Sequence, residues 1–267
     1  MPQPPYFVEA LASTIEGTAQ VCAGLSDEKW GWPTGCPGWS VKDTVAHLYG
    51  LERVLAGDPE PDHELVGEFP HVQGDAGRYM ERHVDALRSL TGAQALAEFN
   101  ETWAARLVYL RSLDADGFAA DAPAPMGTRA PLGRLLPIRV FDCWAHEQDI
   151  RRAIGRAGGL DTDAATVSLT TCKRAAPSVI APVMPAGSSV LFELDGPNGG
   201  HLAASYDGGA ATVLDEVPED PTAVLAMTDE MFAFLCCGRS DTPPGEVKLS
   251  GDTALGEAVV GALGFTP

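Results

Sequence analysis

The sequence is poor in positive charge. Its 267 residues include 18 Lys and Arg against 37 Asp and Glu, which gives a formal net charge of −19. Binding to nucleic acid or to an anionic membrane surface requires clusters of Lys and Arg that neutralise phosphate groups. We therefore expect neither nucleic acid nor a membrane among the partners of this protein, and the acidity itself identifies no partner.

Long hydrophobic runs are also missing. No stretch approaches the roughly 18 apolar residues that a membrane-spanning helix needs. Residues 1–5 contain none of the basic residues that open a secretory signal. The composition, 45% hydrophobic and 21% charged, is that of a globular protein with a core of normal size. These features predict a cytoplasmic protein.

Several cysteine and glycine motifs are absent. The six cysteines show no C-x-x-C spacing, so neither a cysteine zinc site nor a thioredoxin-type motif is expected. Cys143 is interpreted as a small buried side chain. The adjacent Cys236 and Cys237 could be redox-active, but we favour a place in a helix core. The sequence also lacks G-x-x-x-x-G-K-S/T, G-x-G-x-x-G after a strand, and the nucleophile elbow G-x-S-x-G.

The spacing of apolar residues divides the chain into two halves. Up to about residue 157 it is helical, and it predicts helices at about 6–22, 41–55, 77–90, 93–113 and 132–154. Ser40 and Asp43 form the capping-box pattern of a helix start, and Gly155 provides a stop. We expect residues 1–157 to form a four-helix bundle.

The second half adds the alternation and turn residues that are typical of strands. Strands are predicted at about 189–194, 201–206, 211–214, 223–227 and 246–249, with helices at about 163–180, 229–237 and 252–263. We expect residues 158–267 to form a small domain with an antiparallel sheet. The predicted fold class is therefore a two-domain α+β protein.

One short pattern indicates a candidate site. Asp142 and His146 are four residues apart, which places both side chains on one face of a helix. His47 lies on another predicted helix. Two His and one carboxylate from two helices of a bundle would form a three-ligand metal site with a fourth position open, as in catalytic zinc sites. The alternative is a chance D-x-x-x-H pair, with each His merely packed and hydrogen-bonded.

The neighbouring polar residues have simpler interpretations. Asp149 lies one turn beyond His146 and could orient a ligand, as carboxylates behind a metal ligand do, or it could pair with Arg152. The other histidines have no partner at ligand spacing, and we expect surface or packing roles for all four: His63, His71, His83 and His201.

Two sequence blocks resemble the mycothiol-dependent maleylpyruvate isomerase family, whose bundle is of the DinB/YfiT type. They are residues 36–48 (CPGWSVKDTVAHL) and 139–156 (RVFDCWAHEQDIRRAIGR). Residues 237–239 (CGR), 249–256 (LSGDTALG) and the final 266–267 (TP) resemble its small sterol-carrier-like C-terminal domain. The resemblance covers nearly the whole chain. It is fairly specific for the family, but not for one substrate.

The resemblance implies a set of site residues. A divalent metal, usually zinc, would be held by His47, Asp142 and His146. The usual acid of the family is Glu, whereas this sequence has Asp142, whose side chain is one methylene shorter. Arg239 would meet an anionic substrate and is the residue to which the resemblance assigns a catalytic role.

The resemblance also implies a function. The protein would be an enzyme with mycothiol as thiol cosubstrate, in which the metal activates the thiol for addition to an electrophilic small molecule. In the isomerase reaction the thiolate adds to the cis double bond of maleylpyruvate, the new single bond rotates, and loss of the thiolate gives fumarylpyruvate. Two alternatives stay open. One is a mycothiol S-transferase in detoxification or natural-product biosynthesis, and the other is a non-catalytic small-molecule binding protein.

Overall fold

The chain divides into two compact units. A computed structural model describes residues 3–241 and 243–266, so Pro267, part of the similarity noted above, lies outside the described residues. Unit 1 ends at Val167 and unit 2 runs from Ser168 to Thr266. This division falls within helix α8 (Asp163–Ile180), later than the domain boundary at residue 157 that the sequence predicts. The boundary at residue 157 stays a prediction.

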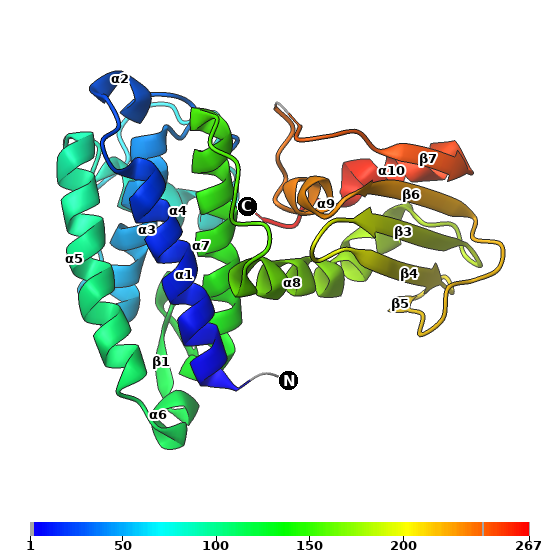
Figure 1. Cartoon of the computed structure of the whole chain (residues 1–267), viewed down its shortest axis with the longest axis horizontal. Coiled ribbons are helices and arrows are strands. Elements are labelled where there is room, and N and C mark those ends of the chain that lie inside the picture. Colours follow the sequence, from blue (N-terminus) through cyan, green and yellow to red (C-terminus); the bar gives the residue numbers. More distant parts are fainter. Residues whose placement is uncertain (1–2, 242, 267) are drawn as a thin grey trace. The chain divides into compact units, whose positions relative to one another are not determined.

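Unit 1 is a helical bundle (Figure 1). Its long helices pack against one another, with α1 against α7 and α3 against both α5 and α7, and the shorter α4 packs on α3. Their bounds are α1 (Pro4–Cys22), α3 (Val41–Ala56), α4 (Gly74–Asp85), α5 (Gly92–Arg111) and α7 (Leu132–Ile154). These agree with the predicted helices, except that α4 begins and ends earlier than the pattern indicated.

Local signals fix the ends of the two helices that matter most for the site. The Ser40 side chain accepts a hydrogen bond from the Asp43 backbone N–H (3.2 Å), and Asp43 Oδ2 accepts one from the Ser40 backbone N–H (3.0 Å). This reciprocal capping box starts α3. At the end of α7, Gly155 has φ 68°, a left-handed conformation that favours glycine.

The connection at residues 117–131 holds more structure than the sequence predicts. It contains a two-stranded antiparallel hairpin, β1 (Asp121–Ala124) and β2 (Thr128–Pro131), with a 3-10 turn, η1 (Pro125–Gly127), at its tip. The short helices α2 (Asp27–Trp30) and α6 (Ala115–Ala119) are also additional. Elements this short have too few residues to show a periodic pattern. The many Gly and Pro residues of this segment therefore indicated only a loop.

Unit 2 is built on a five-stranded sheet with the order β5-β4-β3-β6-β7. The strands are β3 (Ser189–Asp195), β4 (Gly200–Tyr206), β5 (Ala211–Val213), β6 (Ala223–Thr228) and β7 (Lys248–Gly251). Neighbouring described strands pair antiparallel except for β3 and β6, which pair parallel. Phe192 in the central strand stacks on Phe232 of α9, with ring centroids 5.4 Å apart.

Helices complete unit 2. They are the remainder of α8, the 3-10 turn η2 (Ala181–Val183), α9 (Asp229–Cys236) and α10 (Thr253–Ala262). The predicted fold class, a helical bundle followed by a small α+β unit, is thereby confirmed.

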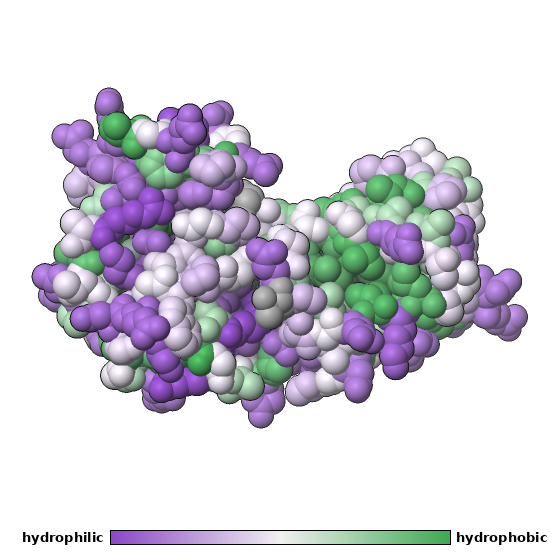
Figure 2. Space-filling model, turned by 90° about the horizontal axis from the view of Figure 1, so that it is seen from above, coloured by the Kyte–Doolittle hydropathy of each residue, from purple (hydrophilic) through white to green (hydrophobic). Residues whose placement is uncertain are grey.

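Figure 2 shows hydrophilic residues over much of the visible face of unit 1 and a broad hydrophobic area on unit 2. None of the described helices has the length and hydropathy to cross a membrane.

Candidate metal centre

The bundle brings His47, Asp142 and His146 together. His47 lies in the middle of α3, whereas Asp142 and His146 lie one turn apart on α7. The Nε2 atoms of both imidazoles point to the same carboxylate oxygen, Oδ1 of Asp142, at 3.5 Å from His47 and 3.6 Å from His146. One ligand atom from each of the three residues lies within 4.8 Å of the other two. This donor set, two imidazole nitrogens and a carboxylate oxygen, suits a divalent metal such as zinc.

Asp149 orients His146 from behind. Its Oδ2 lies 3.1 Å from His146 Nδ1, and its Oδ1 accepts a hydrogen bond of 2.9 Å from Arg152 Nη2. Asp149 therefore pairs with Arg152 and contacts His146 at the same time, and its role in orienting a metal ligand stays a prediction. The contact between Nδ1 and Asp149 fixes the His146 ring with its Nε2 directed toward Asp142.

His47 is also prepared to act as a lone-pair donor. The residue is only 2% exposed, and this burial lowers the pKa of His47 to about 4, against the opposing effect of Asp142. The imidazole is therefore neutral at pH 7. Its Nε2 lies 3.5 Å from Asp142, too far for a good hydrogen bond, and its Nδ1 is buried with no hydrogen-bond partner among the described residues. The 3.5 Å separation of His47 Nε2 and Asp142 Oδ1 leaves room for a metal that both atoms would bind.

The carboxylate of Asp142 stays ionised. Burial by itself opposes the charge, but Arg139 and the two imidazoles outweigh it and hold the pKa of Asp142 well below its usual range. Arg139 Nη1 donates to Oδ2 of Asp142, the oxygen that faces away from the imidazoles. Arg139 in turn donates through Nε to Glu52 Oε2 (2.8 Å) and through Nη2 to the Leu48 carbonyl (2.6 Å).

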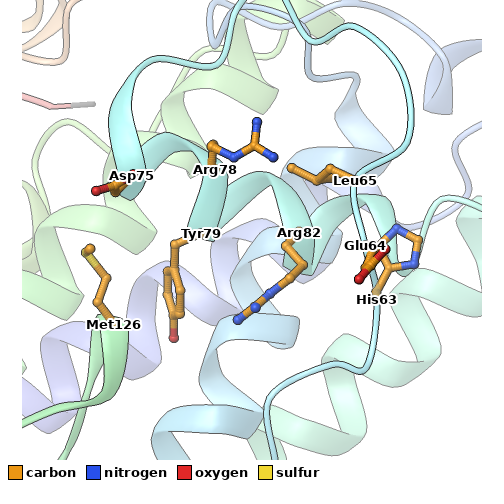
Figure 3. Close-up of a pocket in the computed structure, with 8 residues that line it drawn as sticks. All are labelled: His63, Glu64, Leu65, Asp75, Arg78, Tyr79, Arg82 and Met126. Carbon is orange, nitrogen blue, oxygen red and sulfur yellow. The ribbon is translucent and has the colours of Figure 1, made fainter.

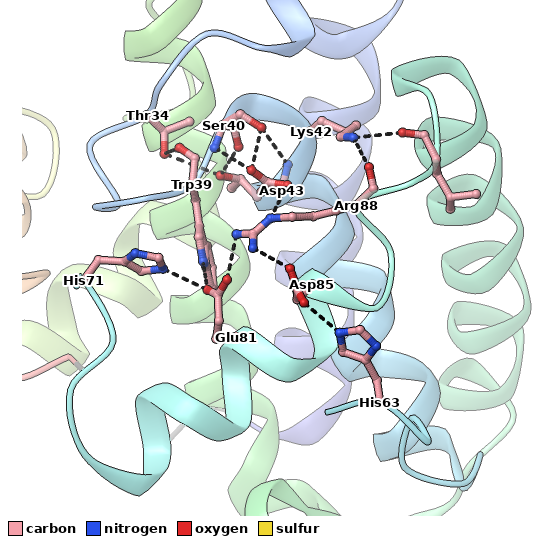
Figure 4. Close-up of polar contacts among 12 residues, drawn as sticks. Thr34, Trp39, Ser40, Lys42, Asp43, His63, His71, Glu81, Asp85 and Arg88 are labelled. Carbon is pink, nitrogen blue, oxygen red and sulfur yellow. Dashed lines mark hydrogen bonds and ion pairs between the residues drawn. The ribbon is translucent and has the colours of Figure 1, made fainter. Parts of the chain in front are cut away.

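A tryptophan forms one wall of the imidazole pair. The Trp39 ring lies 4.8 Å from that of His47 and 5.6 Å from that of His146, measured between centroids. Its indole N–H donates to Glu81 Oε2 (2.8 Å), as Figure 4 shows. Glu81, only 1% exposed, also forms an ion pair with Arg88 (Nη2–Oε1 2.7 Å) and lies 3.0 Å from His71 Nε2.

Sequence reasoning missed these supporting residues. Trp39 belongs to the first family block but was assigned no role there, whereas Glu52 and Glu81 carry no local pattern that separates them from surface acids. A signal was available only for Arg139, which lies three residues before Asp142 and so shares its helix face.

A separate cavity of about 510 Å³ lies beside α4 (Figure 3). It is lined by His63, Glu64, Leu65, Asp75, Arg78, Tyr79, Arg82 and Met126. Charged groups here pair with neighbours: the Tyr79 hydroxyl and Arg82 Nη2 donate to Glu60 at 2.8 and 2.9 Å, and His63 Nε2 lies 2.7 Å from Asp85. The cavity lining includes none of His47, Asp142 and His146.

Two further histidines and three cysteines were singled out by the sequence, and the structure places them as follows. His83 is buried, with Nδ1 2.8 Å from the Tyr79 carbonyl, and His201 is exposed on β4. Cys143 is fully buried, and burial raises the pKa of its thiol well above the ordinary value. Burial likewise raises the pKa of Cys236, and Cys237 is 4% exposed.

Arg239 belongs to unit 2, just after α9. It is 6% exposed, and its Nη1 donates to the Cys237 carbonyl at 2.7 Å. The catalytic role that the sequence suggests for Arg239 stays a prediction.

Comparisons with known proteins identify the family of the chain. The profile of the family described as mycothiol maleylpyruvate isomerase N-terminal domain matches residues 11–151. Uncharacterized proteins from two strains of Mycobacterium tuberculosis are each 20% identical over 255 residues, 95% of this chain and 93% of the relative.

A solved structure shows the same fold. A crystal structure of the mycothiol-dependent maleylpyruvate isomerase matches with a TM-score of 0.60 and 15% identity, over 94% of this chain and 93% of that chain. YfiT from Bacillus subtilis, described as a probable metal-dependent hydrolase with a four-helix bundle, is more distant, with a TM-score of 0.37 over 58% of this chain. The profile match spans more than half of the 267 residues and contains His47, Asp142 and His146, so the chain belongs to the mycothiol maleylpyruvate isomerase N-terminal domain family.

Proposed function

We propose that this protein is a metal-dependent enzyme that uses mycothiol, with His47, Asp142 and His146 as the metal ligands. The observation that carries the proposal is the convergence of these three donor atoms within 4.8 Å, inside the region that matches the family profile. Bundle cores commonly hold metals in this way, with side chains from facing helices. Three protein ligands leave one coordination position for a substrate.

The chemistry proposed for the metal is the activation of a thiol. A divalent ion, which we propose to be zinc, would bind the sulfur of mycothiol and stabilise its thiolate at neutral pH. The residues of the chain prepare the site for this role. His47 is neutral because burial lowers its pKa to about 4, and Arg139 helps to keep Asp142 ionised. Trp39 covers one side of both imidazoles and limits the access of water.

The proposed reaction is the addition of the thiol to an electrophilic double bond. A sulfur–carbon bond forms, the double bond becomes single and rotates, and the sulfur leaves again as the trans product forms. Maleylpyruvate is the first electrophile to test, because the matching crystal structure is that of a maleylpyruvate isomerase. Arg239 would hold a carboxylate of such a substrate, since a guanidinium binds carboxylates through two parallel hydrogen bonds.

The test is thiol-dependent turnover by the purified full chain. We expect about one divalent ion per chain, isomerisation of maleylpyruvate in the presence of mycothiol, and loss of turnover after treatment with a chelator. A stable thioether product with maleylpyruvate or another electrophile would instead identify a mycothiol S-transferase. If metal-loaded protein consumes no thiol with any electrophile in a broad panel, the enzyme proposal is wrong and a binding role takes its place.

A further inference from the structure

We propose that Arg139 is a positioning residue for the metal centre, and that Glu52 and Arg106 hold it in place. The Arg139 guanidinium connects the Asp142 carboxylate of α7 to the backbone of α3 beside His47. The inference rests on the proposed metal site and adds residues to it that touch neither metal nor substrate.

The two oxygens of Asp142 have different partners. Oδ2 accepts a hydrogen bond from Arg139 Nη1, whereas Oδ1 faces the Nε2 atoms of His47 and His146. The hydrogen bond to Oδ2 fixes the rotation of the carboxylate about its last bond. Asp142 therefore presents one oxygen, in one direction, to the space between the imidazoles. Coordination of a metal through that single oxygen follows from this orientation.

Arg139 also ties the two ligand-bearing helices together. Its Nη2 donates 2.6 Å to the carbonyl of Leu48, the residue that follows His47 on α3. Its guanidinium lies 5.3 Å from the ring centroid of Trp103 and the residue is 7% exposed. A buried guanidinium with a hydrogen bond from each of its three nitrogens has little freedom to move. It sets the separation between His47 and the pair on α7.

Glu52 holds Arg139 from the opposite side. Its Oε2 accepts from Arg139 Nε at 2.8 Å, and its Oε1 accepts from Arg106 Nε at 2.7 Å. Glu52 is only 1% exposed and comes one turn after Leu48 on the same helix, α3. Asp142 and Glu52 balance Arg139 and Arg106 in charge. The four side chains together therefore carry no net charge before a metal binds, so Asp142 experiences no unbalanced charge from this group.

The experiment compares metal binding by four full-length variants with that of the wild type. Arg139→Met removes the guanidinium, Arg139→Lys keeps the charge but not the forked geometry, and Glu52→Gln removes the anchor charge. Arg151→Met is the matched control, because Arg151 forms an equivalent pair on α7, donating 2.7 Å to the buried Glu147. Metal-free proteins are titrated with Zn²⁺ against a competing chelator, and with Co²⁺ while the visible spectrum is recorded. Circular dichroism checks that each variant is folded.

We expect the Zn²⁺ affinity of Arg139→Met to be about 10- to 100-fold lower than that of the wild type, as for other residues that orient metal ligands. Arg139→Lys and Glu52→Gln should weaken binding less and shift the Co²⁺ bands in the same direction as Arg139→Met. The affinity and Co²⁺ spectrum of Arg151→Met should match those of the wild type. If Arg139 had a purely structural role, Arg139→Met and Arg151→Met would be destabilised alike. The Co²⁺ bands of Arg139→Met would then match those of the wild type.

Two results would overturn the inference, and they are distinguishable. If the wild type binds Zn²⁺ but Arg139→Met, Arg139→Lys and Glu52→Gln bind it equally well with the same Co²⁺ spectrum, the positioning role is wrong and the metal site stands. If the wild type itself binds neither ion, the proposed function fails and the positioning role fails with it. Should Arg139→Met not fold, Arg139→Lys and Glu52→Gln decide the question.

Discussion

At the scale of single residues, the candidate site consists of two imidazoles and an ionised carboxylate in close contact. Burial keeps His47 neutral, and Asp149 fixes the orientation of His146. Arg139 supplies the positive charge that allows Asp142 to remain ionised at 28% side-chain exposure. Arg139 donates to Oδ2 of Asp142, which leaves Oδ1 facing the two imidazoles.

Replacement of His47 by Ala should abolish the metal site. A lost ligand removes a coordinate bond, so we expect the Zn²⁺ affinity to fall by more than the 10- to 100-fold typical of orienting residues, and thiol-dependent turnover to fall with it. His201→Ala is the control, since His201 is exposed on β4 in unit 2. The metal content and activity of folded variants measure both effects. Full metal and full activity in His47→Ala would rule out His47 as a ligand.

The stability of the metal-free protein should depend on pH through His47. In the unfolded chain this residue takes up a proton as the pH falls through about 6.5, whereas in the folded protein it does so only near a pKa of about 4. Between these values the unfolded state binds more protons, so the free energy of unfolding decreases as the pH falls, by about 3 kcal/mol in total.

Urea unfolding between pH 7 and pH 4 measures this dependence. Asp142 also has a lowered pKa, but its contribution is lost below its ordinary value of 3.8, outside most of this window. His47→Gln, which has no titrating group, should therefore show a flatter profile than the wild type. Equal slopes for the two proteins would show that His47 is not buried in its neutral form.

At the scale of elements, the loop between α3 and α4 packs on the segment that carries Trp39. Gly38 has φ 77°, and a Cβ at this position would lie 2.3 Å from the His71 ring. His71 in turn contacts Glu81, which holds the Trp39 indole (Figure 4). Gly38 is therefore required both by its backbone conformation and by the close approach of the loop.

Gly38→Ala should destabilise the protein more than a glycine replacement that causes backbone strain alone. Gly24 has a similar φ of 70° with no atom within 4 Å of an added Cβ, so Gly24→Ala is the matched control and should cost about 1 kcal/mol. Gly38→Ala should cost about 1–3 kcal/mol more, because it adds overpacking against the His71 ring. Thermal or urea unfolding measures the difference. The double variant Gly38→Ala/His71→Ala should recover part of it, and equal losses in the two single variants would contradict the packing argument.

The elements themselves were largely predictable, since their signals are local. The capping box at Ser40, the stop at Gly155 and the apolar periodicity gave the bounds of α3 and α7 to within a residue or two. The four-residue spacing of Asp142 and His146 and the two family blocks indicated the proposed ligands. The contacts that support Asp142 were not predictable. Arg139 and Glu52 are 87 residues apart in the sequence, and they meet only after the bundle has formed. The parallel β3–β6 pair was missed for the same reason, since strand order is a long-range property.

At the scale of the whole molecule, the proposed functions are divided between the two units. All three proposed metal ligands and the residues that support them lie in unit 1, whereas Arg239 lies in unit 2. We therefore expect metal binding and substrate recognition to be separable, so that a variant of Arg239 changes substrate recognition and leaves metal binding unchanged.

Arg239→Met in the full chain should keep the wild-type Zn²⁺ affinity and lose activity. We expect KM to rise and kcat to fall, because the truncation removes the proposed charge-assisted hydrogen bond to a substrate carboxylate. Such a bond is worth about 1.5–3 kcal/mol, which corresponds to a roughly 10- to 150-fold loss in kcat/KM. Arg239→Lys should recover only part of it, since an ammonium lacks the guanidinium fork. Arg174→Met, which changes another arginine of unit 2, is the comparison for the loss of one positive charge. Unchanged kcat/KM in Arg239→Met would mean that another residue recognises the anionic substrate. If Arg239→Met lost Zn²⁺ affinity together with activity, metal binding and substrate recognition would not be separable.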